Sequence, residues 1–158
     1  MDLKALNLEV NELCRQTGKY IAGEQHRLSS GDIVRKGLHD YVTRVDKHSE
    51  EMLVEGLGRL LPGSGFLVEE QTMKDKGKPY TWVVDPLDGT TNFIHGLPAF
   101  SISVALLHHG SAILGTIFDI PAGECYYAWD GSPAFMNGSE IRVSGSTTLA
   151  DSLLATGF

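Results

Sequence analysis

The sequence predicts an α+β fold in which two N-terminal helices pack on a largely antiparallel sheet. The spacing of the apolar residues changes along the chain. Up to about residue 61 they recur every three or four positions, as on one face of a helix. From Tyr80 onward they alternate in short segments that turn residues separate, as in strands with one buried face. A block of helices followed by a block of strands is typical of this fold class.

Two amphipathic helices are expected in the first third of the chain. The first covers residues 3 to about 28, and its apolar stripe consists of Leu3, Leu6, Val10, Leu13, Thr17 and Ile21. The second is expected to have Asp46 as its N-cap and to stop at Pro62-Gly63. Between them, residues 29 to about 38 contain two glycines and are predicted to be a loop.

The expected strands lie in the second half of the chain, after a first short one at residues 66–68. They follow at residues 80–84, 100–106, 112–118, 124–129 and 140–143. Asn137-Gly138 is a strong hairpin signal before the last of these. Residues 1–150 are therefore taken as one α+β domain, and residues 151–158 as a strand that leads onward from it.

Composition narrows the function classes. The chain has 158 residues, an apolar fraction of 42% and a net charge of −7, which argues against binding to a nucleic-acid backbone. Cys14 and Cys125 are too few and too far apart to suggest a disulfide framework. We find no apolar segment typical of a signal peptide or of a membrane span, so a soluble, cytoplasmic protein is expected.

The chain is organised around residues 82–92, Trp-Val-Val-Asp-Pro-Leu-Asp-Gly-Thr-Thr-Asn. Asp85 stands where a buried strand is expected to stop, because Pro86 cannot continue a paired ladder. A tight turn would bring Asp88 toward the same point. Gly89 permits close approach of a ligand, and Thr90 begins a stretch suited to a helix N-cap, whose N–H groups would face an anion. The stretch predicts a metal and phosphate site, although an acidic turn that merely caps a helix is the plain alternative.

A second acidic pair favours the metal interpretation. Glu69 and Glu70 also follow an apolar strand, at residues 66–68. Such a pair is often only solvated surface charge. Two strand ends that deliver carboxylates to one sheet edge, however, supply the oxygen ligands that a hard divalent cation such as Mg²⁺ requires.

These residues resemble the signature of the inositol monophosphatase family, whose members are magnesium-dependent, lithium-sensitive sugar-phosphate phosphatases. The likeness rests on Glu69-Glu70 and on residues 85–93, Asp-Pro-Leu-Asp-Gly-Thr-Thr-Asn-Phe. It extends upstream to Lys36 and residues 40–46, which resemble K…D-x-V-T-x-x-D, and downstream to residues 134–138, which resemble G-A-F-x-N-G. The resemblance implies the first half of an αβαβα sandwich. It also implies a further domain that would complete the metal site with another Asp.

The resemblance also implies roles for individual residues. The implied metal ligands are Glu69, Asp85, the Leu87 carbonyl and Asp88. Glu69 together with the Thr90–Asp46 pair would position a metal-activated water, and the implied phosphate-binding residues are Asp88, Gly89 and Thr90. Lys36 and Glu70 would lie near the metal.

The expected reaction is the hydrolysis of a phosphate monoester, with inositol 1-phosphate as the first candidate. A small phosphorylated substrate, no nucleic-acid polymer, no membrane and a homodimer of the full-length form are expected. Three alternatives stay open: another sugar- or nucleotide-phosphate phosphatase of the superfamily, a non-catalytic metal-binding module, and a haloacid-dehalogenase-type phosphatase. The last would need two Asp residues two apart, whereas Asp85 and Asp88 are three apart.

Overall fold

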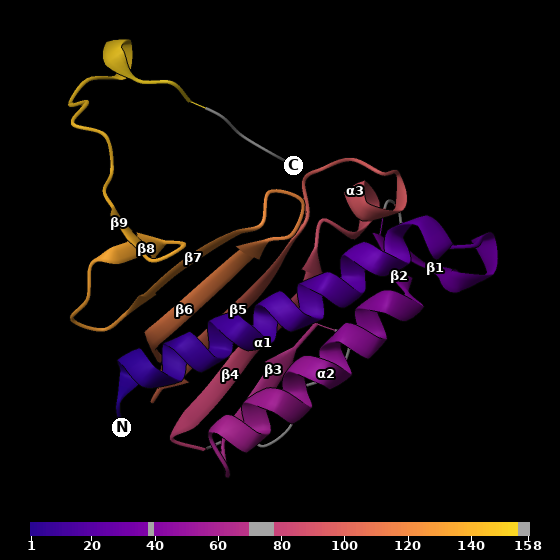
Figure 1. Cartoon of the computed structure of the whole chain (residues 1–158), viewed down its shortest axis with the longest axis horizontal. Helices are drawn as coiled ribbons and strands as arrows, with labels where there is room; N and C mark the ends of the chain where they lie inside the picture. Colours follow the sequence, from indigo (N-terminus) through magenta and orange to yellow (C-terminus); the bar gives the residue numbers. More distant parts are fainter. Residues whose placement is uncertain (38–39, 70–77, 155–158) are drawn as a thin grey trace.

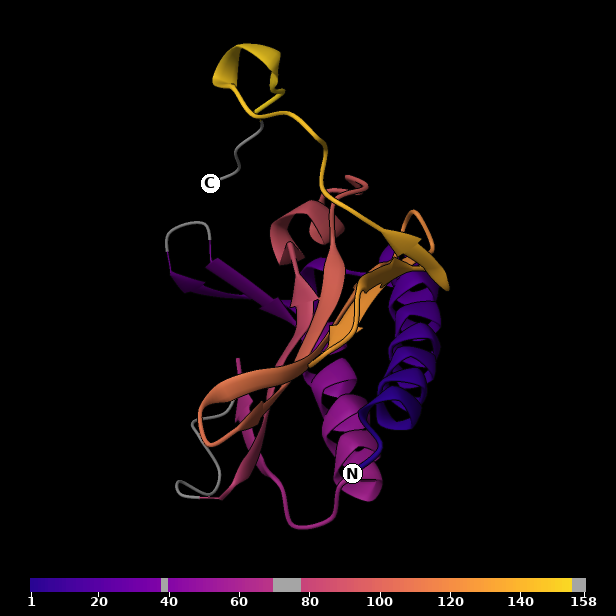
Figure 2. The same ribbon diagram turned by 90° about the vertical axis from the view of Figure 1, so that its left-hand side faces the viewer.

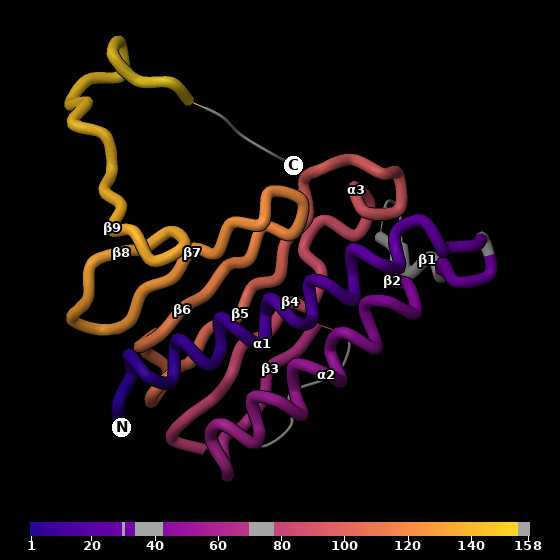
Figure 3. The backbone as a smooth tube through the Cα atoms, in the orientation of Figure 1, coloured from indigo at the N-terminus to yellow at the C-terminus, as the bar shows by residue number. Residues whose placement is uncertain are grey.

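The computed structural model describes residues 1–37, 40–69 and 78–154, and it has two layers. Two long helices, α1 (Leu3–Glu24) and α2 (Arg44–Leu60), lie side by side on one face of a seven-stranded sheet, as Figures 1 and 2 show. Figure 3 follows the backbone from the helix layer into the sheet and out along the C-terminal segment. The predicted α+β fold class is confirmed.

The first helix agrees with its predicted stripe. Asp2 is the N-cap, and its carboxylate accepts a hydrogen bond of 3.1 Å from the Ala5 N–H. The buried residues of α1 include Val10, Thr17 and Ile21. The helix ends at Glu24, and a short 3-10 turn (Gln25–Arg27) occupies the rest of the predicted range.

The second helix begins earlier than predicted. Thr43 is its N-cap, with Asp46 three positions later, and the two side chains form a reciprocal capping box. The prediction that Asp46 itself is the N-cap was therefore wrong. The threonine takes that position because its hydroxyl accepts hydrogen bonds from the Val45 and Asp46 N–H groups.

The segment between the helices is more ordered than predicted. After a 3-10 turn (Ser30–Asp32), β1 (Ile33–Gly37) pairs antiparallel with β2 (Asp40–Thr43) in a separate two-stranded sheet. The prediction of a loop over residues 29–38 was wrong for residues 33–37. Val34 lies opposite Val42 in this ladder, and valine is a residue type that is enriched in strands.

The large sheet has the order β3-β4-β5-β6-β7-β8-β9. Only β3 is parallel to its neighbour, β4, and the other adjacent pairs are antiparallel. The strands are β3 (Gly65–Val68), β4 (Tyr80–Asp88), β5 (Ser101–His108), β6 (Ser111–Asp119), β7 (Glu124–Trp129), β8 (Ala134–Met136) and β9 (Ser139–Ile141). Asn137 and Gly138 both have positive φ, at 48° and 88°, which confirms the predicted hairpin turn.

Beyond β9 the chain extends away from the sheet and contains a 3-10 turn (Leu149–Asp151) (Figure 1). Residues 152–154 are not in a strand, and residues 155–158 lie outside the described residues. The predicted final strand over the latter stays a prediction. In the part of the chain that the structure describes, no helix is both long and apolar enough to cross a bilayer.

The core lies between the helices and the sheet. Trp82, Ile102 and Leu106 are fully buried there. α1 also makes buried polar contacts with β6, where the Asn7 amide donates to the Thr116 hydroxyl at 3.2 Å and that hydroxyl donates to Asn11 at 2.8 Å. These hydrogen bonds fix α1 on the strand, because a buried amide without a partner is costly.

Gly18 of α1 allows the helix to approach β6 closely. A Cβ atom at Gly18 would lie 2.5 Å from the Phe118 ring, whereas one at Gly23, later in the same helix, would meet nothing within 4 Å. We expect Gly18→Ala to lose about 1–3 kcal/mol of unfolding free energy through overpacking. Gly23→Ala should instead gain up to about 1 kcal/mol from helix propensity. Urea denaturation of both variants measures this. Equal stabilisation by both would show that α1 does not pack on Phe118 in this way.

Candidate metal and phosphate site

A β-bulge in β4 shapes the candidate site. Asp85 pairs with Ser103 of β5 and Asp88 pairs with Ser101, so two residues of β4 oppose the single Ile102. This two-against-one count defines a bulge, which bends the strand. The prediction that Pro86 interrupts the ladder is confirmed, but the strand resumes and ends at Asp88 rather than at Asp85.

The turn after β4 requires a glycine. Gly89 has φ +89°, and a Cβ atom there would lie 2.6 Å from the Ala99 carbonyl oxygen. Gly89 occupies the N-cap position of the short helix α3 (Thr90–Ile94), with no side-chain cap. The predicted N-cap within residues 90–92 was therefore wrong, since the Asn92 amide donates back to Ala99 at 2.8 Å.

The Thr90 hydroxyl, at the start of α3, contacts Asp46 of α2. Its oxygen lies 2.8 Å from Asp46 Oδ1 and 2.9 Å from the Leu87 carbonyl oxygen. A hydroxyl carries one proton, so it donates fully to only one of these acceptors, and a carboxylate is the stronger acceptor. The hydroxyl then leaves lone pairs of the Leu87 carbonyl available for another ligand.

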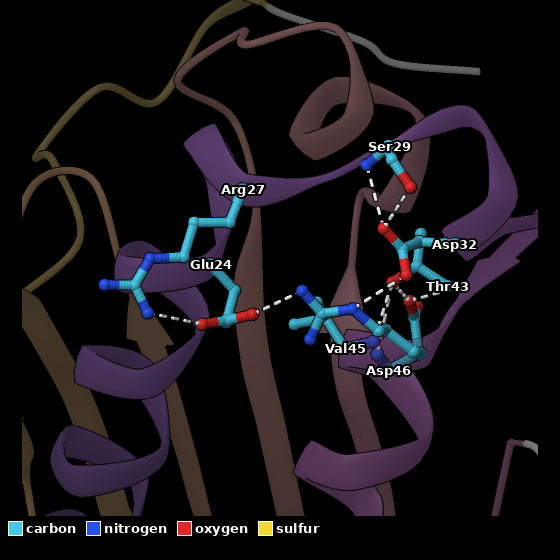
Figure 4. Close-up of polar contacts among 8 residues, drawn as sticks. Glu24, Arg27, Ser29, Asp32, Thr43, Val45 and Asp46 are labelled. Atoms are coloured by element: carbon cyan, nitrogen blue, oxygen red, sulfur yellow. Dashed lines mark hydrogen bonds and ion pairs between the residues drawn. The ribbon is translucent and has the colours of Figure 1, made fainter.

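Asp46 is the buried centre of this group, with 1% of its surface exposed. Its Oδ2 accepts hydrogen bonds from the Thr43 N–H at 2.9 Å and from the Thr43 hydroxyl at 2.5 Å, as Figure 4 shows. Oδ1 remains for Thr90. The carboxylate thus joins the start of α2 to the start of α3, although residues 46 and 90 are far apart in sequence.

Ion pairs hold the segment that leads to Asp46. Arg44 contacts Glu24 at the end of α1 at 2.6 Å and Asp32 at 2.8 Å, and Arg27 also pairs with Glu24 (Figure 4). Arg44 lowers the pKa of Glu24 through this hydrogen bond. The Ser29 hydroxyl and N–H bind Asp32 from the other side. This network anchors the chain on both sides of the β1–β2 hairpin, next to the capping box.

Two further carboxylates meet at the end of β3. Val68 pairs with Val84 in the parallel ladder, so Glu69 comes next to Asp85, and their side chains share a hydrogen bond. Burial raises the pKa of Asp85, and the nearby Asp88 and Asp46 raise it further. Hydrogen bonds from the Leu87 N–H, at 3.1 Å, and with Glu69 oppose this shift. Two carboxylates in contact need a proton or a cation between them.

The donor set fits a hard cation. Glu69, Asp85, the exposed Asp88 and the Leu87 carbonyl supply oxygen ligands only, the type that Mg²⁺ prefers together with water. Among residues 1–37, 40–69 and 78–154, however, no three Asp, Glu, His or Cys side chains are grouped tightly enough to hold a metal ion by themselves. The backbone carbonyl and water molecules would have to complete the shell.

The structure thus brings most of the predicted site residues together. Asp46, Thr90 and Leu87 are in direct contact, as are Glu69 and Asp85, while Gly89 forms the turn between them. Two predicted residues cannot be placed: the Lys36 backbone belongs to β1 but its side chain is not described, and Glu70 lies outside the described residues.

Thr43 is a residue that the sequence prediction missed. The signal was present, because Thr43 and Asp46 have the spacing of a capping box.

Comparison with known proteins shows which class of protein has this fold and these site residues. The model of the inositol monophosphatase family matches residues 4–158. An inositol-1-monophosphatase of Mesorhizobium japonicum is 35% identical over 96% of this chain and 57% of its own length. A Nus factor SuhB of Pasteurella multocida is 36% identical over 97% of this chain and 57% of its own length. The crystal structure of the extragenic suppressor protein suhB from Bartonella henselae superposes with a TM-score of 0.82 at 34% identity, over 90% of this chain and 55% of that one.

The chain belongs to the inositol monophosphatase family. It spans about half the length of the curated relatives that it matches.

The raised pKa of Asp85 predicts a pH dependence in metal-free protein. Because the folded state holds this proton more tightly than the unfolded chain does, the associated stability is present below the unfolded pKa of about 3.9 and is lost as pH rises through the folded value. Asp85→Asn keeps the hydrogen-bonding shape without the charge. We expect the variant to match the unmutated protein in acid and to become the more stable of the two toward neutral pH. Urea denaturation with chelator across this range measures the difference, and a difference that does not change with pH would contradict the assignment.

Proposed function

We propose that this chain carries the metal-binding and phosphate-binding half of a magnesium-dependent phosphatase that hydrolyses a phosphate monoester. Inositol 1-phosphate is the first candidate substrate, since relatives of similar sequence carry the name inositol-1-monophosphatase. The observation that carries the proposal is the hydrogen bond from Thr90 to the buried Asp46, beside the paired carboxylates Glu69 and Asp85.

Glu69, Asp85, the Leu87 carbonyl and Asp88 would hold Mg²⁺. When bound there, Mg²⁺ supplies a Lewis acid that lowers the pKa of water and offsets the charge of the phosphate group. Such an offset is needed, because a chain with a net charge of −7 repels a phosphate ester.

The protein groups would position the attacking water. Because the Thr90 proton is held by Asp46, the Thr90 oxygen presents lone pairs and would accept a hydrogen bond from that water. Glu69, next to Asp85, would receive the proton as the water attacks phosphorus. In this scheme Asp46 acts only as a hydrogen-bond acceptor.

The start of α3 would bind the phosphate oxygens. The first N–H groups of a helix have no acceptor within the helix, and the backbone at Gly89 and Thr90 turns into α3 next to Asp88. These N–H groups would stabilise the charge that develops on the phosphate oxygens as the ester bond breaks.

Further parts of the proposal come from the family resemblance. These are lithium sensitivity, a cytoplasmic location, a homodimer of the full-length form and a further Asp that would complete the metal site. For the 158-residue chain assayed by itself, we expect weak Mg²⁺ binding and slow turnover.

The proposal is tested by phosphate release from inositol 1-phosphate, fructose 1,6-bisphosphate and 3′-phosphoadenosine 5′-phosphate, with Mg²⁺ and then with chelator. Chelator-sensitive release that prefers inositol 1-phosphate supports the proposal, and release from another ester would reassign the substrate. Mg²⁺ binding without release from any of them would favour a metal-binding module. A phosphoenzyme on Asp85 would favour the haloacid-dehalogenase-type reaction instead.

Variants of Thr90 test the proposed water-positioning role. Thr90→Val removes the hydroxyl but keeps the shape, and we expect a loss of about 10²–10⁴ in turnover. Thr91→Val is the matched control, because Thr91 is the exposed neighbour in the same helix and its rate should stay close to that of the unmutated protein. Steady-state phosphate release measures both. Near-normal turnover by Thr90→Val would remove Thr90 from the mechanism.

A further inference from the structure

A small pocket lies between α1 and the end of β6, on the side of the sheet that the helices cover (Figure 2). Its volume is about 200 Å³. One wall is a stripe of α1, and the other is the end of β6 with the turn that leads to β7. The residues that the argument uses are Arg15, Gly18, Lys19 and Ala22 on the helix, and Phe118 and Ile120 on the strand side.

The floor of the pocket is apolar. Phe118 and Ile120 are buried, and Gly18 lets the Phe118 ring lie directly against the helix. Ala22, one turn further along α1, is exposed and has too small a side chain to fill the space. Since an apolar cavity of about 150 Å³ is large enough to hold a benzene ring, this pocket has room for one ring.

Two cations stand at the rim of the pocket. Arg15 and Lys19 are four residues apart on α1, so their side chains leave the helix on the same face. Neither forms an ion pair with another residue that the structure describes. The other arginines with described side chains each pair with a carboxylate; these are Arg27, Arg44, Arg59 and Arg142.

Hydrogen bonds hold the Arg15 guanidinium without neutralising it. Arg15 donates to the side-chain oxygen of Asn137, in the β8–β9 turn, at 3.4 Å. The same oxygen accepts from the Cys125 N–H at 3.0 Å, and the Asn137 amide donates to the carbonyl of Gly123, which also lines the pocket, at 3.4 Å. An amide oxygen carries no net charge, so the positive charge of Arg15 remains available to an anion.

The carboxylates of the β6–β7 turn do not line the pocket. Asp119 accepts a hydrogen bond of 3.0 Å from the Ala122 N–H within the turn, and Glu124 accepts one from the Tyr126 hydroxyl. Side chains alternate along a strand, so Asp119 projects to the face opposite Phe118. The charged groups that line the pocket are therefore both positive, although the chain as a whole has a net charge of −7.

We propose that this pocket binds a small organic carboxylate that carries a single aromatic ring. The ring would lie on Phe118 and Ile120 beside Gly18, and the carboxylate would pair with Arg15 and Lys19 at the rim. A guanidinium can hold a carboxylate through two parallel hydrogen bonds. An apolar lining with a few polar groups that fix the orientation is typical of small-molecule sites. The proposal does not depend on the proposed enzymatic function, since the pocket shares no residue with the candidate metal and phosphate site.

Titration of the metal-free, ¹⁵N-labelled chain with phenylacetate, followed by NMR, tests the proposal. We expect saturable shifts of the amides of Gly18, Lys19 and Gly123, and nuclear Overhauser contacts between the ligand ring and Phe118. The dissociation constant should be about 1 mM, in the range expected for a ligand of about ten non-hydrogen atoms. Phenylacetamide has the same shape without the charge, and acetate has the charge without the ring. Each should bind about tenfold more weakly than phenylacetate.

Three variants separate charge from shape. Arg15→Gln and Lys19→Gln should each weaken phenylacetate binding about fivefold, because each removes one cation from the rim. Ala22→Leu should prevent binding by filling the pocket while keeping both cations. The matched control is Lys4→Gln, which makes the same charge change at an exposed position of α1 outside the pocket and should bind phenylacetate like the unmutated chain.

Salt gives a further expectation, because ion pairs at a pocket rim are screened. Binding of phenylacetate should weaken with rising salt, whereas binding of phenylacetamide should change little. The proposal would be overturned by an absence of saturable shifts, by shifts confined to residues away from the pocket, or by equal affinity for phenylacetate and phenylacetamide. Equal weakening by Lys4→Gln and Lys19→Gln would also overturn it.

Discussion

The buried carboxylate of Asp46 is the interaction on which the site depends. It is 1% exposed and accepts three hydrogen bonds, two from Thr43 and one from Thr90. Burying a carboxylate without hydrogen-bond partners would cost several kcal/mol of folding free energy. The folded state therefore favours conformations in which Thr43 and Thr90 keep donating to Asp46. A cap at the start of one helix thereby fixes a hydroxyl at the start of another.

Several neighbouring features of the structure hold Thr90 and Asp46 in contact. The bulge at residues 86–87 turns the Leu87 carbonyl toward Thr90, and the positive φ of Gly89 starts α3 at once after β4. Arg44, two residues before Asp46, forms ion pairs with Glu24 at the end of α1 and with Asp32 just before β1. These ion pairs link the start of α2, where Asp46 lies, to α1 and to the small β1–β2 sheet. The parallel ladder of β3 with β4 then sets Glu69 against Asp85.

Sequence patterns predicted the layers from local periodicity, and a short motif indicated the candidate site residues, whose roles stay a prediction. The apolar stripe of α1, the alternation of β5 and β6 and the Asn137-Gly138 turn are local signals, and the structure agrees with them.

The miss at the start of α2 was local: Asp46 was predicted as the cap, but Thr43 takes that position and forms a capping box with Asp46, a spacing that the sequence already contains. The other misses arose where contacts between distant residues decide. β4 resumes after Pro86 because Ser101 of β5 offers Asp88 a partner. The β1–β2 pairing likewise depends on two short segments that each look like loop when read alone.

The central claim is that the oxygen ligands around Asp85 are arranged for a divalent cation. Calorimetric titration of the chain with Mg²⁺ at weakly acidic pH, repeated in two buffers of different ionisation enthalpy, tests it most directly. Because Asp85 and Glu69 share a hydrogen bond and burial raises the pKa of Asp85, Mg²⁺ should displace a proton on binding. We expect proton release from the unmutated chain and none from Asp85→Asn. Binding without proton release, or the same release from both proteins, would contradict a metal site at these carboxylates.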